Sequence, residues 1–433
     1  MLRVDALSLT LIASIGLSAA YALVQRPKRV AGPRSVDVPS KILLKVRTVT
    51  VGVFFQPNDP AQWRRALEQA VALNRDATAE LTKLGYEVQT TRISTNSFEE
   101  WCPSLSPSCA LDVFKALDKD LEELGINLFN AGPAASREAI ELVPKIVALS
   151  PRISASGSLA DPLDMESAAC LADAILEIAD KTPGGEGNFQ FCASFNVGAG
   201  IPFFPAAYHA GEAPSFAIGC ETSAILADAL PKAIAERPGD LRGAKERLTA
   251  EFERQMAPLH AFATGLSERH GVAYDGIDAS IAPLGTAPPL TASFESLNIF
   301  DRFGDSGTLA ASALVTSAVK AIGNGIKLCG YTGLMLPPCE DAGLAQRGTE
   351  KTYRIHDLLA YSSVCGLGLD TVPIPGDVSS ARLTALLLDV GALAFRLNKP
   401  LTCRIFPVPG KKAGMMTSFA NPYLCDTAIF EVP

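Results

Sequence analysis

Short apolar stretches rich in β-branched residues alternate along the chain with longer stretches in which apolar residues recur at helical spacing. Residues 47–55, RTVTVGVFF, are typical of a strand, because β-branched and aromatic side chains fit a pleated surface. Residues 60–84 have the apolar spacing of a helix and stop at Gly85, a residue that commonly follows a helix end. The alternation continues to residue 408 and is typical of a mostly parallel α/β sheet or barrel.

The pattern predicts about ten strands with helices between most of them. The predicted strands are residues 47–55, 86–95, 126–133, 152–159, 188–200, 214–221, 276–283, 332–338, 369–377 and 401–408. The predicted helices are residues 60–84, 110–124, 134–149, 162–181, 222–235, 241–270, 308–323 and 379–397. No internal repeat or linker interrupts this series, so we expect residues 41–433 to form one large α/β barrel domain with surrounding helices.

The N-terminal segment differs from the rest. Residues 6–24, ALSLTLIASIGLSAAYALV, carry no charge, and as a helix they would reach about 28 Å, roughly one hydrocarbon core. More cationic residues follow this segment than precede it, and the positive-inside rule then places the large domain in the cytoplasm. We predict a single-pass membrane helix at residues 6–24 and a linker up to residue 40.

A cleaved signal peptide is the alternative interpretation, and the protein would then be secreted or organellar. Ala20, Tyr21 and Ala22 form a small-x-small cleavage pattern. The position of the basic cluster after the apolar run favours the anchor, as does the absence of any N-x-S/T sequon.

Composition narrows the classes of function. Apolar residues make up 48% and charged residues 19%, which is enough to bury a large core and argues against global disorder. The net charge of −8, with no basic stripe, argues against a nucleic-acid partner. Ten cysteines are present, but none are spaced C-x-x-C, so the sequence does not support a structural zinc site.

Polar and small residues gather where the predicted strands end. Because ligands of parallel α/β folds bind at the carboxyl ends of strands, we expect these residues to line one polar pocket for a small-molecule substrate. The predicted substrate-binding residues are Asn130, Gly132, Ser156, Asn196, Glu221 and Asp377, and the predicted catalytic residues are Asp278, Glu340, Asp370, His209 and Cys365. For each of them taken singly, a turn-forming or helix-capping role is the alternative.

Cys365 lies in YSSVCGLGLDTVPIPGD, beside two glycines and two aspartates. It is either a nucleophile or a small buried residue, and no histidine lies close enough in sequence to activate it. His209 lies in PFFPAAYHAGEAP, a loop too apolar to be merely solvated, and is expected in the pocket.

The chain lacks several motifs that would define a cofactor or a mechanism. It has no P-loop, no G-x-S-x-G, no H-E-x-x-H and no complete dinucleotide fingerprint, so no nucleotide cofactor is expected. A loosely held divalent cation such as Mg²⁺ on Glu340, Asp341 or Asp377 is left open.

Several long motifs resemble one known family. They are GYTGLMLPPCEDAGLAQR, YSSVCGLGLDTVPIPGD and FGDSGTLAASALVTSAVKA, with INLFNAGPA, IPFFPAAYH and FAIGCE in support. The family is known as domain of unknown function 711, and the resemblance covers residues 45–432. It implies a fold similar to the barrel of pyruvate formate-lyase and other glycyl radical enzymes, with ten strands in two halves of five. The C-terminal stretch has Gly410 and Gly414 but not the R-V-[AS]-G-[YF] motif of those enzymes, so the resemblance does not extend to radical chemistry.

We therefore expect an enzyme that acts on a small polar metabolite by acid–base and cysteine chemistry. The alternative is a non-catalytic ligand-binding or scaffold protein that kept an enzyme-like barrel. A carboxylate-lined pocket containing Cys365 would favour the enzyme, and a centre filled with apolar side chains would favour the scaffold. A homodimer is the default expectation for such a fold.

Overall fold

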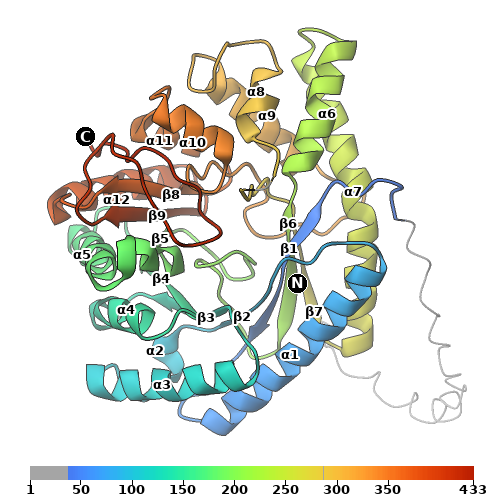
Figure 1. Ribbon diagram of the computed structural model, residues 1–433. Coiled ribbons are helices and arrows are strands. Elements are labelled where there is room, and N and C mark those ends of the chain that lie inside the picture. Colours follow the sequence, from blue (N-terminus) through green and yellow to red (C-terminus); the bar gives the residue numbers. More distant parts are fainter. Residues whose placement is uncertain (1–37, 286) are drawn as a thin grey trace, which may run out of the picture. The chain divides into compact units, whose positions relative to one another are not determined.

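The computed structural model describes residues 38–285 and 287–433 (Figure 1). Within these residues nine strands form one sheet in the order β7-β6-β1-β2-β3-β4-β5-β9-β8. The strands are β1 (Lys45–Val53), β2 (Thr91–Thr95), β3 (Phe129–Ala134), β4 (Ile153–Leu159), β5 (Phe191–Phe195), β6 (Ser215–Glu221), β7 (Ala273–Asp278), β8 (Gly368–Pro375) and β9 (Leu401–Val408). Neighbouring strands are parallel except β1 with β6 and β5 with β9. The predicted mostly parallel α/β class is confirmed.

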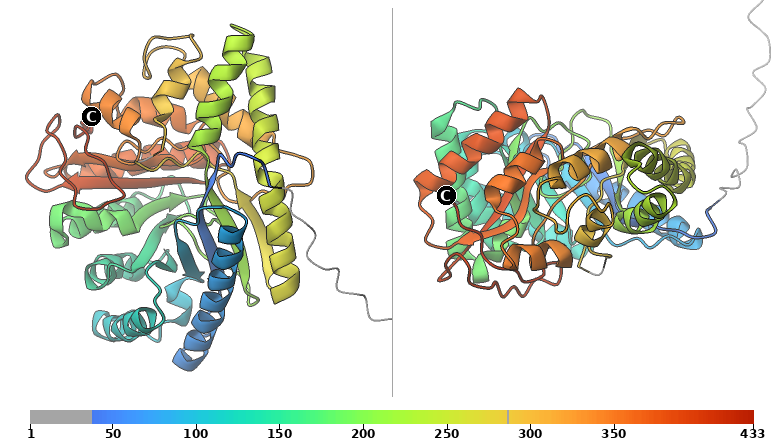
Figure 2. Two further views of the ribbon diagram at one scale, coloured as in Figure 1. Left: turned by 45° about the vertical axis from the view of Figure 1, so that its right-hand side comes forward. Right: turned by 90° about the horizontal axis from the view of Figure 1, so that it is seen from above.

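Helices lie between most strands, as the pattern predicts. They are α1 (Pro60–Lys83), α2 (Phe98–Trp101), α3 (Pro107–Glu123), α4 (Arg137–Leu149), α5 (Met165–Lys181), the 3₁₀-helix η1 (Pro183–Gln190), α6 (Ser223–Glu236), α7 (Leu241–His270), α8 (Leu290–Glu295), α9 (Thr308–Lys320), α10 (Ala342–Thr349), α11 (Ile355–Ser362) and α12 (Ser380–Arg396). In two further views, helices α1, α4, α5 and α12 follow the outer side of the sheet (Figure 2).

Helix α1 illustrates how local chemistry sets these elements. Asp59 accepts a hydrogen bond from the N–H of Gln62 at 2.9 Å, and Pro60 occupies the first turn, where a missing N–H does no harm. The Trp63 ring then stacks on Phe55, just beyond the end of β1, with ring centroids 5.4 Å apart. This contact fixes the helix against the sheet.

The strands have two chemically different faces, because successive side chains of a strand point to opposite sides. In β5, Phe191, Ala193 and Phe195 belong to the main hydrophobic core. The alternate residues Cys192 and Ser194 lie on the other side of the strand, away from that core. The helices therefore cover an apolar face, and the opposite face is free to carry polar groups.

The barrel of about ten strands that the family resemblance implied is not shown, since no ladder joins the edge strands β7 and β8. Residues 332–338, predicted as a strand, form one isolated bridge beside β7, between Leu334 and Ile281. The Asp278 carboxylate accepts the N–H groups of Tyr331 and Thr332 at 2.9 and 3.0 Å. Thr332 begins the predicted strand, and its N–H group and those of Gly333 and Leu334 bind side-chain oxygens, so they are not available for a strand ladder and the segment is a loop.

The expected membrane-anchored location also has to be corrected. Across residues 38–285 and 287–433, every helix is too short or too polar to cross a bilayer. The predicted apolar helix at residues 6–24 lies outside the described residues.

Replacement of Asp278 by alanine tests whether this carboxylate holds the loop. The change leaves the N–H groups of Ser280, Tyr331 and Thr332 without their acceptor. We expect the free energy of unfolding to fall by about 2–4 kcal/mol, measured by urea denaturation. The exposed Asp377→Ala should change it by less than about 0.5 kcal/mol, and equal losses in the two variants would contradict the role assigned to Asp278.

Candidate functional site

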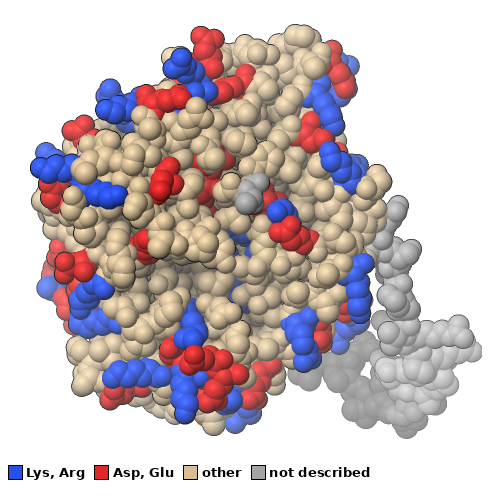
Figure 3. All heavy atoms as spheres, in the orientation of Figure 1, with Lys and Arg blue, Asp and Glu red and all other residues tan. Residues whose placement is uncertain are grey.

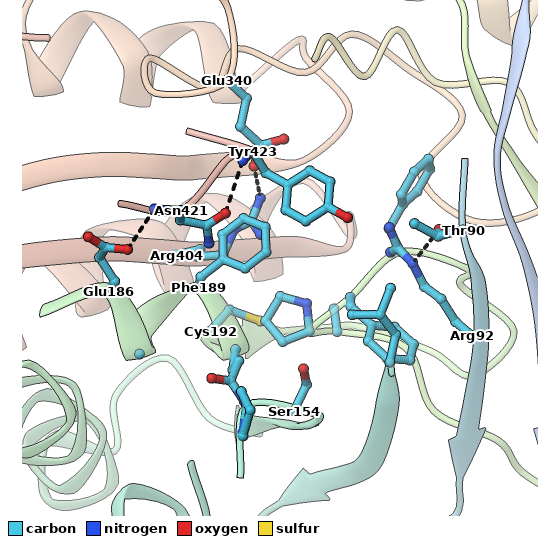
Figure 4. Close-up of a pocket in the computed structure, with 18 of the residues that line it drawn as sticks. Thr90, Arg92, Ser154, Glu186, Phe189, Cys192, Glu340, Arg404, Asn421 and Tyr423 are labelled. Carbon is cyan, nitrogen blue, oxygen red and sulfur yellow. Dashed lines mark hydrogen bonds and ion pairs between the residues drawn. The ribbon is translucent and has the colours of Figure 1, made fainter. Parts of the chain in front are cut away.

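The inner face of the sheet encloses a cavity of about 940 Å³. Its walls include inward side chains from six strands, which are Arg47 (β1), Arg92 (β2), Ser154 (β4), Cys192 (β5), Asp370 (β8) and Arg404 (β9). Figure 4 shows labelled side chains from opposite walls pointing into this common space. The cavity lies toward the amino ends of β1 to β5, since Gln89, Leu128 and Gln190, which precede their strands, also line it.

Two carboxylates and two guanidinium groups form a buried ion network in the wall. Glu340 accepts a hydrogen bond from Arg47 Nη2 at 3.0 Å through Oε2, and one from Arg404 Nη2 at 2.6 Å through Oε1. Arg404 Nε also donates to Asp370 Oδ1 at 2.6 Å. All four side chains are at most 10% exposed, so water screens these contacts little.

This network shows how strongly the sheet curves. Four strands separate β1, which carries Arg47, from β9, which carries Arg404. In a flat sheet that separation would be about 24 Å. Because one carboxylate, Glu340, contacts both guanidinium groups, the sheet must bend round the cavity.

Burial and the neighbouring charges act in opposite directions on the pKa values of this network. Burial raises the pKa of Glu340, with help from the Asp370 carboxylate, against the lowering by Arg404 and Arg47. Burial opposes the charge on Arg404, but Asp370 and Glu340 outweigh it and raise its pKa above the ordinary value. Glu340 is therefore a carboxyl group that takes up a proton more readily than one in water.

Arg92 differs from the other two arginines of the wall. Its Nε donates to Thr90 Oγ1 at 3.3 Å, and its guanidinium lies over the Phe204 ring at 5.2 Å. No carboxylate of the described residues forms an ion pair with it. Burial, followed by repulsion from Arg47 and Arg404, lowers the pKa of Arg92 to about 9. A buried cation without a carboxylate is costly to the fold, so its environment favours an anionic ligand.

The C-terminal segment covers part of the cavity. Both oxygens of Glu186 in η1 accept backbone N–H groups from this segment, from Ala420 at 2.7 Å and from Asn421 at 2.9 Å. The Tyr423 ring stacks parallel to the Phe189 ring, with ring centroids 6.0 Å apart, and the Arg404 guanidinium lies 5.0 Å from the centre of the Phe189 ring.

On the molecular face seen in Figure 1, charged side chains gather toward the margins and the centre is largely uncharged (Figure 3).

Two of the residues predicted from the sequence line the cavity, namely Glu340 and Asp370. Asn130 and Asp278 support its wall instead. Asn130 Nδ2 donates to the Pro205 carbonyl at 2.6 Å, which fastens a loop that lines the cavity. Asp278 fixes the loop that carries Tyr331. Burial raises the pKa of Asp278, although four hydrogen bonds from Ser280, Tyr331 and Thr332 oppose the shift.

The remaining predicted binding residues lie away from the cavity walls. Gly132 has a positive φ of 81°, and a side chain there would meet the Asn96 backbone. Ser156 is buried within β4, and Glu221 accepts the N–H of Ser223 at 3.1 Å at the start of α6. Asn196 and Asp377 are exposed. A ligand-binding role for these residues stays a prediction.

His209 and Cys365 also lie outside the cavity lining. The His209 ring packs on Gly52, its Nδ1 lies 3.4 Å from Ser215 Oγ, and burial lowers its pKa. Cys365 is 1% exposed and belongs to the main hydrophobic core. The thiol that does line the cavity is Cys192, and burial raises its pKa, so it is protonated near neutral pH.

Glu340, Asp341 and Asp377, the residues considered as ligands of a loosely held Mg²⁺, do not come together in one metal site. Asp341 accepts N–H groups from Leu344 at 2.8 Å and Leu290 at 2.9 Å, as the cap of α10, while Glu340 is held by arginines. Among the described parts of the chain, no three His, Cys, Asp or Glu side chains come together closely enough to hold a metal ion.

The sheet, its cavity and the buried charges define an α/β protein with a charged cavity on one face of its sheet. Residues 40–421 match the family model described as "Uncharacterised ACR (DUF711)", and the chain belongs to this family. It is similar to a UPF0210 protein of Desulfovibrio desulfuricans, with 29% identity over 90% of this chain and 91% of that protein. It is also similar to a UPF0210 protein of Listeria monocytogenes, with 27% identity over 87% and 89%. The predicted family is confirmed, and these names state no activity.

Paired substitutions distinguish the arginines of the wall. Arg404→Leu leaves Glu340 and Asp370 short of a cation, and we expect it to lower the free energy of unfolding by about 3–5 kcal/mol. Arg92→Leu removes an unpaired buried charge, and we expect the free energy of unfolding to equal that of the wild type or to exceed it by about 1 kcal/mol. Urea denaturation of both variants measures the difference. A loss in Arg92→Leu as large as in Arg404→Leu would show that Arg92 has a structural partner.

The lowered pKa of His209 predicts a pH effect on stability. Below the unfolded-state pKa of about 6.5, the unfolded chain binds a proton at this histidine before the folded chain does, so stability falls as the pH falls. We expect His209→Gln to remove this loss of stability, whose slope is at most about 1.4 kcal/mol per pH unit as the pH falls below about 6.5. The exposed His356→Gln serves as control, and equal slopes in wild type and His209→Gln would contradict the prediction.

Proposed function

We propose that this protein is an enzyme that binds a small organic anion in the cavity and transfers a proton with Glu340 and Asp370. The observation that carries the proposal is Arg92, a buried guanidinium with no carboxylate partner among the described residues, in the same cavity as two buried acids. Perturbed titratable groups in a cavity are typical of catalytic sites.

Charge balance supports this assignment. The buried side chains Arg47, Arg92 and Arg404 bring three positive charges to the wall, and the buried Glu340 and Asp370 bring two negative ones. Lys181 and Glu186, which also line the cavity, add one charge of each sign. A bound monoanion would neutralise the difference. A proton that then moves between ligand and Glu340 leaves the total charge of the buried site unchanged, which keeps the step free of a new desolvation penalty.

The acid–base step follows from the contacts of Glu340. Each carboxylate oxygen has two acceptor positions, and each oxygen of Glu340 uses one of them on an arginine. The other position is free to take a proton from a carbon next to the ligand's carboxyl or carbonyl group. The electron pair of that C–H bond stays on the ligand, where Arg47 and Arg404 stabilise the developing negative charge.

A non-catalytic ligand-binding protein is the second candidate. The observation in its favour is that both carboxylates are already ion-paired and the Cys192 thiol is kept protonated. The two candidates share the anion site and differ only in the proton transfer, so one experiment on binding and one on exchange separate them.

The anion site is tested by thermal melting of the wild type with small carboxylates. We expect a rise in melting temperature that Arg92→Met abolishes, because the unpaired guanidinium supplies the binding charge. Arg75→Met, at an exposed arginine paired with Asp76, is the matched control and should keep the rise. If no carboxylate shifts the wild type, or if Arg92→Met responds as the control does, the proposed site is wrong.

The proton transfer is tested by proton NMR of a bound carboxylate in D₂O. We expect the wild type to exchange the hydrogen next to the carboxyl group for deuterium, and Glu340→Gln to slow this exchange by about 10²–10⁴-fold. Thermal melting should show that Glu340→Gln still binds the carboxylate. Binding without exchange in the wild type would favour the non-catalytic protein.

A further inference from the structure

We infer that the ligand is a monocarboxylate with an uncharged, apolar body of several carbon atoms; this rests on the proposed function and specifies its substrate class. The cavity has two chemically distinct parts that adjoin one another. One part is the charged wall around Arg92, and the other is an apolar patch on the inner side of the sheet.

The apolar patch is a cluster separate from the main core. Its buried members that line the cavity include Cys192, Phe203, Ala206, Tyr331, Met335 and Leu367. The main core fills the space between sheet and helices, whereas this patch faces the cavity. Buried apolar side chains that line a cavity in this way favour an apolar ligand surface, because contact with it removes apolar area from water.

The patch directly adjoins the anion site. Phe204 lies against the Arg92 guanidinium, and the next residue toward the N-terminus, Phe203, belongs to the patch. On the other side, Cys192 belongs to the patch and lies near Arg404 and Asp370, whose charges act on its thiol. A carboxylate on Arg92 therefore extends its carbon chain over the patch and toward the buried acids.

Charge and size restrict the ligand further. Four cationic and three acidic side chains line the cavity, and the surplus of one positive charge fits one carboxylate rather than two. A cavity of about 940 Å³ is near the upper end of the roughly 300–1,000 Å³ of ligand sites, so acetate would leave most of it unfilled. A single charged head and a larger uncharged body match both observations.

The test is isothermal titration of the wild type with acetate, butanoate, hexanoate and phenylacetate, and with succinate and inorganic phosphate for comparison. We expect each added methylene to tighten binding about fourfold, since a buried methylene contributes about 0.8 kcal/mol. Hexanoate and phenylacetate should then bind on the order of a hundredfold more tightly than acetate. Succinate and phosphate should bind more weakly than hexanoate.

A substitution in the apolar patch tests whether the patch causes the tighter binding of longer carbon chains. Met335→Ser should reduce the difference between hexanoate and acetate at least severalfold and leave acetate binding nearly unchanged, because the anion site is untouched. Met415→Ser, at a methionine that is 48% exposed, is the matched control. The wild-type series decides the question without either variant if Met335→Ser does not fold.

The outcomes separate this inference from the proposed function. If succinate or phosphate binds as tightly as hexanoate, or if chain length has no effect, the inferred ligand class is wrong while the anion site stands. If none of these anions binds, both fail.

Discussion

The contact between Arg404 and two carboxylates, Glu340 and Asp370, is the interaction on which the rest of the site depends. It fixes the loop that carries Glu340 against strands β8 and β9, and through Arg47 it reaches β1 on the far side of the cavity. Buried charges of this kind are tolerated only when they satisfy one another. The sheet is thus curved by ionic contacts on its inner face and by helix packing on its outer face.

The same requirement explains why Arg92 stands apart. Every other charge in the wall has an opposite charge within hydrogen-bonding distance or lies at the margin of the cavity, as Glu186 does at the C-terminal segment. Arg92 has only a threonine and an aromatic face. Functional sites are where a protein is expected to break the rules that stabilise a fold, which is why this one side chain supports the functional proposal more than the carboxylates do.

Much of the architecture could be predicted from periodicity, because long helices and β-branched strands have strong local signals. Helix α7 and strand β9 agree with their predicted limits. The tenth strand was not formed because the first N–H groups of the segment bind side-chain oxygens, Asp278 among them, and no local pattern contains such long-range contacts. The carboxyl ends of the central strands did not form the cavity, because a loop covers them through contacts such as His209 N–H to the Thr95 carbonyl.

Within the site, Glu340 and Asp370 were identified from glycine- and proline-rich loops, whereas the three arginines were missed. Their signal was present, since a charged residue inside an apolar strand is rare unless it is paired or functional.

The attachment of the C-terminal segment has one more consequence. Glu186 binds the main chain at Ala420 and Asn421 and not their side chains. Every amino acid except proline offers the same N–H group. Proteins with this attachment can therefore change the side chains that cover the cavity, and with them the range of molecules admitted, while the segment stays bound in the same place.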